Sequence, residues 1–168
     1  MQKAIRLFLD LEDTVVDNWD DFMFIPSKCE KIRNYIKDNN IAEVIIFSFA
    51  IDDEKDEEIF KRQHREDLER VLGVKVGLVV TSNDVKRITG HKLLHELKYF
   101  GKQISFLHYI DIIKDDNTDY VLIDDMVENL TVAYCDSNNI ITLINIDSWG
   151  NKPKVFGDDW HQKGVLIQ

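Results

Sequence analysis

The chain is organised around Leu7-Phe8-Leu9-Asp10-Leu11-Glu12-Asp13-Thr14-Val15-Val16, in which an apolar run leads straight into acidic residues. The run predicts a buried strand of a parallel sheet, because such strands are covered on both faces. Asp10 follows the run directly, and Glu12 and Thr14 come next at alternate positions. Open α/β sheets bind ligands at the carboxyl ends of their strands. The stretch therefore indicates an acidic site, although a strand that merely ends in a polar turn would show the same pattern.

The same pattern returns at two other apolar runs. Val44-Ile45-Ile46-Phe47 leads into Ser48. Tyr120-Val121-Leu122-Ile123 leads into the pair Asp124-Asp125. This repetition favours a functional site over a polar turn.

The ordered set resembles the haloacid dehalogenase superfamily of phosphoryl-transfer enzymes. Members carry a strand ending in Asp-x-Asp-x-Thr, a strand ending in Ser or Thr, a lysine, and a strand ending in paired acids. The likeness covers residues 5–146 and departs from the family at Glu12, where members have a second aspartate. The matching positions are Asp10, Glu12, Thr14, Ser48, Lys102, Asp124 and Asp125.

The resemblance implies a phosphatase mechanism with a role for each residue. Asp10 attacks phosphorus and becomes an aspartyl-phosphate, which water then hydrolyses. Glu12 stands where the family has the acid that protonates the leaving oxygen and then activates water. Ser48 is expected to donate a hydrogen bond to a phosphoryl oxygen, and Thr14 is expected to lie beside the substrate.

The resemblance also implies a Mg²⁺ site, because this ion takes oxygen ligands and retains water. The expected ligands are the Asp10 carboxylate, the backbone carbonyl of Glu12 and the Asp125 carboxylate. Asp124 is expected to support the ion through water or as an outer partner. Asn129 stands where the family often has another acid and is a weaker candidate.

Two lysines compete for the family's conserved cationic role. Lys102 follows Gly101 and opens the predicted helix that leads to the strand before Asp124, which fits the family's order best. Lys92 is the alternative, because it also follows a glycine after the third predicted strand. Either residue would also be ordinary as a solvated surface lysine.

Positive charge gathers between residues 86 and 102 although the whole chain has a net charge of −10. His91, His95, Lys98 and Lys102 have spacings that place them on one helical face. A cationic rim beside a phosphoryl site favours a substrate with more than one phosphate, a nucleotide or a nucleic-acid end. A solvated polar face is the plainer interpretation. The cationic residues of this segment are Lys86, Arg87, His91, Lys92, His95, Lys98 and Lys102.

A tryptophan near the acidic motif is a further candidate for substrate binding. Trp19 lies where the resembled family has a small flap, so its ring could stack on a base or sugar. The favoured interpretation is that Trp19 and Phe22 only hold this loop against the core.

The composition suits one soluble domain spanning 1–168. The acidic balance disfavours a protein that coats nucleic acid, which needs a clustered positive surface. Cys29 and Cys135 lack metal-ligand spacing, so we expect reduced, buried thiols in a cytoplasmic protein. The apolar run at the start ends at Asp10, which is too short for a signal peptide or membrane span.

The alternation of patterns predicts an α/β fold with a doubly wound, Rossmann-like parallel sheet of about five strands and helices on both faces. The tail at 147–168 resembles nothing regular. The space between the motifs holds no inserted cap domain, and capless members of the resembled family act on bulky substrates or close their sites by forming homo-oligomers. The predicted strands are 4–10, 43–48, 74–81, 119–124 and 140–145, and the predicted helices are 27–39, 52–72, 91–100, 103–114 and 127–135.

Three functions compete at this point. The leading one is a Mg²⁺-dependent phosphomonoesterase, and its partner would be a phosphorylated small molecule or nucleic-acid end. The second is a catalytically quiet relative that binds a phosphorylated ligand or a protein, suggested by Glu12. The third is a receiver-like domain, which is disfavoured because its phosphorylated aspartate would stand at Thr81-Ser82.

Overall fold

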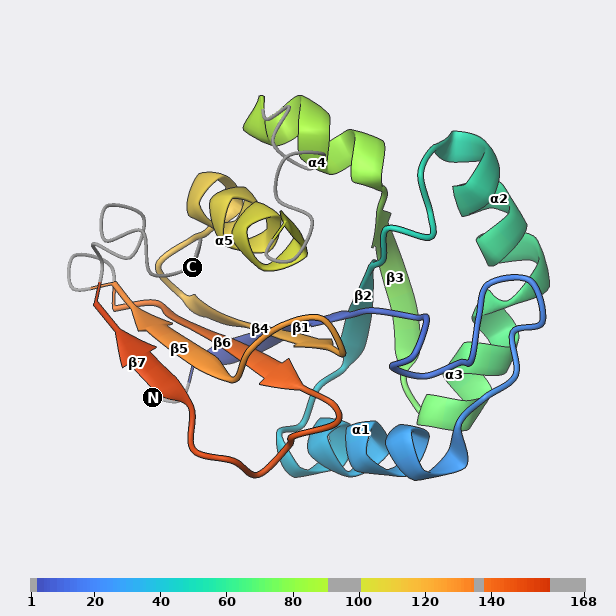
Figure 1. Cartoon of the computed structure of the whole chain (residues 1–168), viewed down its shortest axis with the longest axis horizontal. Helices are drawn as coiled ribbons and strands as arrows, with labels where there is room; N and C mark the ends of the chain where they lie inside the picture. Colours follow the sequence, from blue (N-terminus) through green and yellow to red (C-terminus); the bar gives the residue numbers. More distant parts are fainter. Residues whose placement is uncertain (1–2, 91–100, 135–137, 158–168) are drawn as a thin grey trace.

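A computed structural model describes residues 3–90, 101–134 and 138–157. Its centre is a seven-stranded sheet with the order β3-β2-β1-β4-β6-β5-β7 (Figure 1). The first five strands in this order run parallel, β5 is antiparallel to β6, and β7 is parallel to β5. The strands are β1 (Ala4–Leu9), β2 (Glu43–Phe47), β3 (Lys75–Val80), β4 (Thr118–Asp124), β5 (Leu130–Ala133), β6 (Ile140–Asn145) and β7 (Lys154–Phe156).

The five predicted strands are confirmed, and the sheet has two more. The helix predicted at 127–135 is wrong, because Leu130–Ala133 is a strand paired with β6. Leu130 and Val132 are buried while Thr131 and Ala133 are partly exposed, which is the alternation of a strand. The tail that was expected to be irregular contributes Lys154–Phe156 as an edge strand.

Five helices accompany the sheet in the part of the chain that the structure describes. The helix predicted from 103 begins at Gly101, and the helix predicted at 91–100 lies outside the described residues. An additional helix follows Thr81, whose side chain forms a capping box with Asp84. The helices are α1 (Pro26–Asp38), α2 (Glu54–Gln63), α3 (Arg65–Leu72), α4 (Ser82–Thr89) and α5 (Gly101–Ile113).

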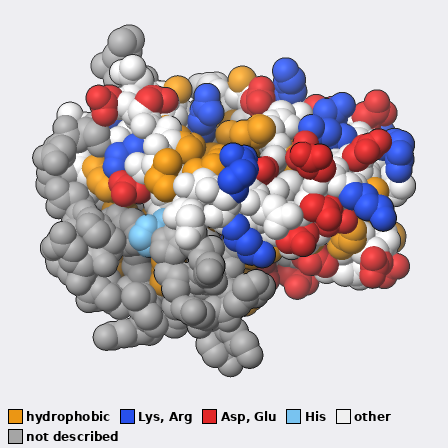
Figure 2. Space-filling model, turned by 90° about the horizontal axis from the view of Figure 1, so that it is seen from above, with side chains coloured by type: hydrophobic (Ala, Val, Ile, Leu, Met, Phe, Trp, Pro, Cys, Tyr) orange, Lys and Arg blue, Asp and Glu red, His pale blue; other side chains and the backbone are white. Residues whose placement is uncertain are grey.

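Two predicted helix ends differ from those observed. α1 begins at Pro26, one residue earlier than predicted, and its N-cap residue Ile25 forms no side-chain capping hydrogen bond. Proline suits this position because its missing N–H would have no helical partner there. The single helix expected over 52–72 is broken at His64 into α2 and α3. The charged residues 52–58 at the start of α2 are exposed or partly exposed, and Figure 2 shows acidic and basic side chains interspersed on the right of the molecule, where Figure 1 places α2.

Helices lie on both faces of the sheet and form two separate cores (Figure 1). Leu7 and Leu9 point into the core with α1, α2 and α3, whereas Phe8 points into the core with α4 and α5. Cys29 of α1 is a buried free thiol within the first core, and Cys135 lies outside the described residues. No helix in the described ranges combines the length and apolar character needed to cross a membrane.

Candidate functional site

Parallel pairing brings the first and last acidic motifs together. β1 and β4 pair in register up to Leu9 and Ile123, and the backbone N–H of Asp10 donates to the carbonyl oxygen of Ile123 at 3.1 Å. Asp10 and Asp124 are therefore neighbours at the carboxyl edge of the sheet, where open α/β folds bind ligands. Both side chains are buried, at 4% and 0% exposure.

A tight turn folds the rest of the first motif back over Asp10. The carbonyl oxygen of Leu11 accepts from the N–H groups of Thr14, Val15 and Val16 at 3.2, 2.9 and 3.1 Å. Asp13 has a left-handed backbone with φ 58°, a conformation that aspartate adopts more readily than most residues. The Thr14 hydroxyl donates to Asp10 Oδ2 at 2.9 Å, and Asp125 Oδ1 lies 3.4 Å from it as a second acceptor.

Lys102 reaches this cluster from the first turn of α5. Its Nζ lies 2.6 Å from Asp10 Oδ1 and 2.5 Å from Asp124 Oδ2, and its side chain is only 11% exposed. Burial would lower the pKa of Lys102, but the carboxylates of Asp10 and Asp124 outweigh it and raise this pKa. Lys102 is therefore in contact with Asp10 and Asp124, and the alternative, Lys92, lies outside the described residues.

The acidic cluster fits a hard divalent cation. Oxygen atoms of Asp10, Asp124 and Asp125 lie within 4.8 Å of one another. Burial, reinforced by the charges of Asp10 and Asp124, raises the pKa of Asp125 to about 8. Burial likewise raises the pKa of Asp124, against the opposing effect of Lys102. The three carboxylates repel one another when they are ionised, and the single ammonium of Lys102 only partly neutralises them. A bound divalent cation would reduce this repulsion.

One buried oxygen strengthens this fit. Asp124 Oδ1 accepts from the backbone N–H of Met126 at 2.7 Å. Asp124 Oδ2 is buried and forms an ion pair with Lys102 Nζ at 2.5 Å, which leaves further lone pairs on this oxygen. A buried carboxylate oxygen with unused lone pairs is a natural metal ligand.

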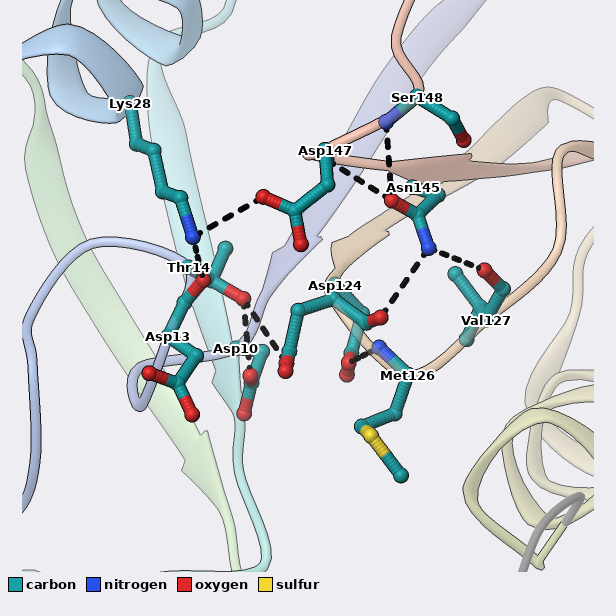
Figure 3. A network of polar contacts seen from close by, with 11 residues as sticks. Asp10, Asp13, Thr14, Lys28, Asp124, Met126, Val127, Asn145, Asp147 and Ser148 are labelled. Atoms are coloured by element: carbon teal, nitrogen blue, oxygen red, sulfur yellow. Dashed lines mark hydrogen bonds and ion pairs between the residues drawn. The ribbon is translucent and has the colours of Figure 1, made fainter.

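The loops beside this cluster are fixed by Asn145, the last residue of β6 (Figure 3). Its amide nitrogen donates to the carbonyl oxygens of Asp125 and Val127 at 3.1 and 2.8 Å. Its amide oxygen accepts from the N–H groups of Asp147 and Ser148 at 2.8 and 3.1 Å. Asn145 therefore uses its full hydrogen-bonding capacity to join the loop after β4 to the loop after β6.

Asn129 belongs to this framework rather than to the acidic cluster. Its amide nitrogen donates to the carbonyl oxygen and hydroxyl of Ser148 at 3.0 and 3.2 Å. Its amide oxygen accepts from the N–H of Asn145 at 2.8 Å. These contacts use both ends of the Asn129 amide, so this residue positions the loops after β4 and β6.

Lys28 is a second residue that sequence reasoning missed. From α1 its Nζ donates to the carbonyl oxygen of Asp13 at 2.6 Å and pairs with Asp147 at 3.1 Å (Figure 3). It thus ties the turn after β1 to the loop after β6. Its spacing gave no hint of this, because neither partner belongs to the same element.

The side chain of Glu12 is turned toward the flap. Its Oε2 accepts from the backbone N–H of Trp19 at 2.8 Å. Trp19 packs edge-on against Phe22 and His64, with ring centroids 6.1 and 5.5 Å away, and Phe22 stacks on His64 at 3.8 Å. This packing agrees with the favoured interpretation that Trp19 and Phe22 hold the loop against the core.

Ser48 stands where the second motif was expected. It follows β2 directly, two residues beyond Ile46, the partner of Leu9, and it is 1% exposed. Its hydroxyl oxygen accepts a long 3.4 Å contact from the N–H of Ala50.

The structure describes only part of the cationic segment between residues 86 and 102. His91, Lys92, His95 and Lys98 lie outside the described residues. Of the others, Arg87 pairs with Asp84 at 3.3 Å on the surface, whereas Lys102 is buried among carboxylates. Lys102 therefore belongs to the buried acidic cluster and is not part of a solvated helical face.

No protein-family model, curated protein or solved structure matches this chain. The function is therefore inferred from the geometry of the site.

Proposed function

We propose that the chain is a Mg²⁺-dependent phosphomonoesterase of the haloacid dehalogenase type, with Asp10 as the nucleophile. The observation that carries the proposal is the convergence of Asp10, Asp124, Asp125 and Lys102 at the carboxyl edge of a parallel sheet. Phosphoryl transfer needs mainly positioning and charge stabilisation, and these groups provide both.

The proposed metal is held by the carboxylates of Asp10 and Asp125, with Asp124 in support and the backbone carbonyl of Glu12 as a further ligand. When bound, Mg²⁺ supplies charge neutralisation for the phosphoryl oxygens and for the carboxylates. Lys102 adds a positive charge on the other side of Asp10, where it holds Oδ1.

In the proposed reaction an Asp10 oxygen forms a bond to phosphorus while the bond to the ester oxygen breaks. Thr14 and Lys102 hold the two Asp10 oxygens and so orient the carboxylate for this attack. Ser48 donates a hydrogen bond to a phosphoryl oxygen. The leaving oxygen takes a proton from Glu12, and water then attacks phosphorus, returns a proton to Glu12 and releases phosphate from Asp10.

A non-catalytic function is the second candidate because of the position of Glu12. The Oε2 atom of its carboxylate accepts a hydrogen bond from the Trp19 N–H, which holds the Glu12 side chain at the flap. A chain in which Glu12 stays on the flap would bind a phosphorylated ligand or protein partner without hydrolysing it.

The proposed substrate is a phosphorylated small molecule, a nucleotide or a nucleic-acid end. The absence of an inserted cap in the motif spacing favours a bulky substrate or a site completed by a homo-oligomer. A cytoplasmic location is part of the same proposal.

The test is release of phosphate from a panel of nucleotides and sugar phosphates, with and without Mg²⁺, by the parent and by Asp10→Asn. We expect metal-dependent turnover that Asp10→Asn lowers by several orders of magnitude, because the amide is a poor nucleophile and carries no charge for the metal. Near-normal turnover by Asp10→Asn would show that the motif is wrongly assigned. Metal-independent binding without turnover would favour the second candidate.

A further inference from the structure

A groove outside the acidic cluster lies between α1 and the loop after β6. Its volume is about 350 Å³. It is lined by Lys31, Asn34, Tyr35, Asp38 and Trp149. Tyr35 and Trp149 meet edge-to-face with ring centroids 5.6 Å apart at 65°, and both remain partly exposed. The groove therefore offers aromatic surface next to polar and charged groups.

The groove is connected to the proposed active site through both of its walls. On α1, Lys28, Lys31 and Tyr35 occupy positions i, i+3 and i+7, which share one helical face. Lys28 contacts the turn that carries Asp13, so this face begins at the active-site rim. At 1.5 Å per residue, Tyr35 lies about 10 Å farther along α1 than Lys28.

The other wall is the loop that Asn145 fixes. Asp147 of this loop pairs with Lys28 at 3.1 Å, and Trp149 follows two positions later. Figure 1 shows this loop passing from β6 toward α1 on the lower face of the sheet. Contacts with Asn145 and Lys28 thus fix the backbone at Asp147 and Ser148, directly before Trp149.

The chemistry of the groove suits a planar ring carried on a phosphorylated sugar. Half-buried aromatic side chains provide stacking surfaces for nucleobases. Lys31 is exposed and forms no ion pair within the described part of the chain, so its charge is available to an anion. Tyr35 lies about 10 Å along α1 from Lys28, whose Nζ contacts the turn that carries Asp13, so the groove lies on the side of α1 that leads away from the acidic cluster.

We propose that Tyr35 and Trp149 form a base-binding subsite, so that the phosphate ester is the terminal phosphate of a nucleotide or nucleic-acid strand. This rests on the proposed function for the position of the phosphate. The base lies against the Tyr35–Trp149 pair, and Lys31 faces the phosphate of the next nucleotide. The competing possibility is that the two rings only fasten the loop to α1.

The test measures binding in the Asp10→Asn protein with Mg²⁺, which separates affinity from turnover. The probes are 5′-AMP and ribose 5-phosphate, which differ only in the base, and calorimetry gives the two dissociation constants. We expect 5′-AMP to bind at least about tenfold more tightly, because stacking on an aromatic side chain contributes roughly that factor or more. Trp149→Leu should abolish the difference while ribose 5-phosphate binds as before, and Trp149→Phe should retain most of it.

Trp19→Leu is the matched control, because Trp19 is the other partly exposed tryptophan beside the motif. It should leave the ratio of the two constants unchanged. A ratio that is lost in Trp19→Leu and kept in Trp149→Leu places the base on the flap and overturns the proposal. Equal affinity of the parent for both probes overturns it as well.

A variant at an exposed residue tests the proposal independently in case Trp149→Leu does not fold. Lys31→Glu should weaken binding of a 5′-phosphorylated dinucleotide about tenfold at low salt and leave 5′-AMP unaffected, with the loss shrinking as salt rises. No change with the dinucleotide contradicts the proposed path along α1. Turnover of both probes by the parent without base discrimination refutes the subsite alone. Base-dependent binding without any turnover refutes only the phosphatase.

Discussion

Lys102 is the residue at which burial and charge oppose each other most directly. Its ammonium is almost removed from water, yet two carboxylates at hydrogen-bonding distance keep it charged. The same contacts place a counter-charge beside the buried carboxylates of Asp10 and Asp124. Lys102 therefore matters for stability as well as for the proposed chemistry.

We expect Lys102→Ala to lower the free energy of unfolding by about 3–5 kcal/mol, because it leaves buried carboxylates without their counter-charge. Chemical denaturation checks this, and added Mg²⁺ should restore part of the loss. Lys154→Ala is the control, since its ion pair with Glu128 is at the surface and should cost no more than about 1 kcal/mol. Equal losses for the two variants would contradict the buried arrangement.

Glu12 supports a sharper experiment now that its contact is known. We expect Glu12→Gln to reduce turnover at least about a hundredfold, as is typical of losing general acid–base catalysis. The glutamine oxygen can still accept from Trp19, so the flap and Mg²⁺ binding should be preserved. Turnover on matched esters with good and poor leaving groups is the measurement, and the loss should be larger for the poor one.

Glu12→Asp completes the comparison. It shortens the side chain by one methylene and should remain active. If Glu12→Gln hydrolyses both esters as well as the parent does, another group supplies the proton. If only Glu12→Asp is active, the native chain is a binder.

Among the elements, the loop after β4 depends on β6 for its position. The two donated hydrogen bonds from Asn145 fix the backbone of Asp125 and Val127 from the neighbouring strand. Positioning contacts behind a metal ligand commonly affect affinity as strongly as the ligands do.

We expect Asn145→Ala to weaken Mg²⁺ binding about 10–100-fold while the far-ultraviolet circular dichroism stays native. Titration of the metal by calorimetry gives the affinity. Asn151→Ala is the control, because its side chain is exposed in the same loop region. An unchanged affinity in Asn145→Ala would mean that the loop holds its shape without this amide.

The elements that could be predicted from the sequence are those whose pattern of apolar and polar residues fits only one type of secondary structure. Long apolar runs such as Tyr120–Ile123 can be buried only inside the sheet, and acids at their ends fall at one edge. Leu130–Ala133 is too short for periodicity to separate a strand from a helix, and its pairing with β6 decided the outcome. The contacts of Asn145 and Lys28 join different elements, so no local spacing encodes them.

At the scale of the whole molecule, the crowded carboxylates make stability depend on pH. Asp125 has a pKa of about 8 in the folded protein against 3.8 as its usual value, so the folded state retains a proton that the unfolded chain releases. The free energy of unfolding without metal therefore contains a term that is most favourable below the usual pKa and declines as pH rises from about 4 to 8.

Asp125→Asn removes this titration, so we expect its stability relative to the parent to increase steadily over that pH range. The measurement is the free energy of unfolding of both proteins in a metal chelator at several pH values. Mg²⁺ should reverse the trend in the parent, because it competes with the proton and binds more tightly as pH rises. A constant difference between the two proteins would show that Asp125 titrates normally.

The order of the strands has a consequence for how the chain is made. β1 is synthesised before the other six strands but lies in the middle of the sheet, and its partner on one side, β4, begins at Thr118. Until that strand is synthesised, one edge of β1 has unpaired backbone groups that can associate with other nascent chains. A chain truncated before Thr118 should therefore aggregate, and it would carry Asp10 with no Asp124 beside it. The proposed active centre can form only late in synthesis, when the last of its widely separated residues has emerged.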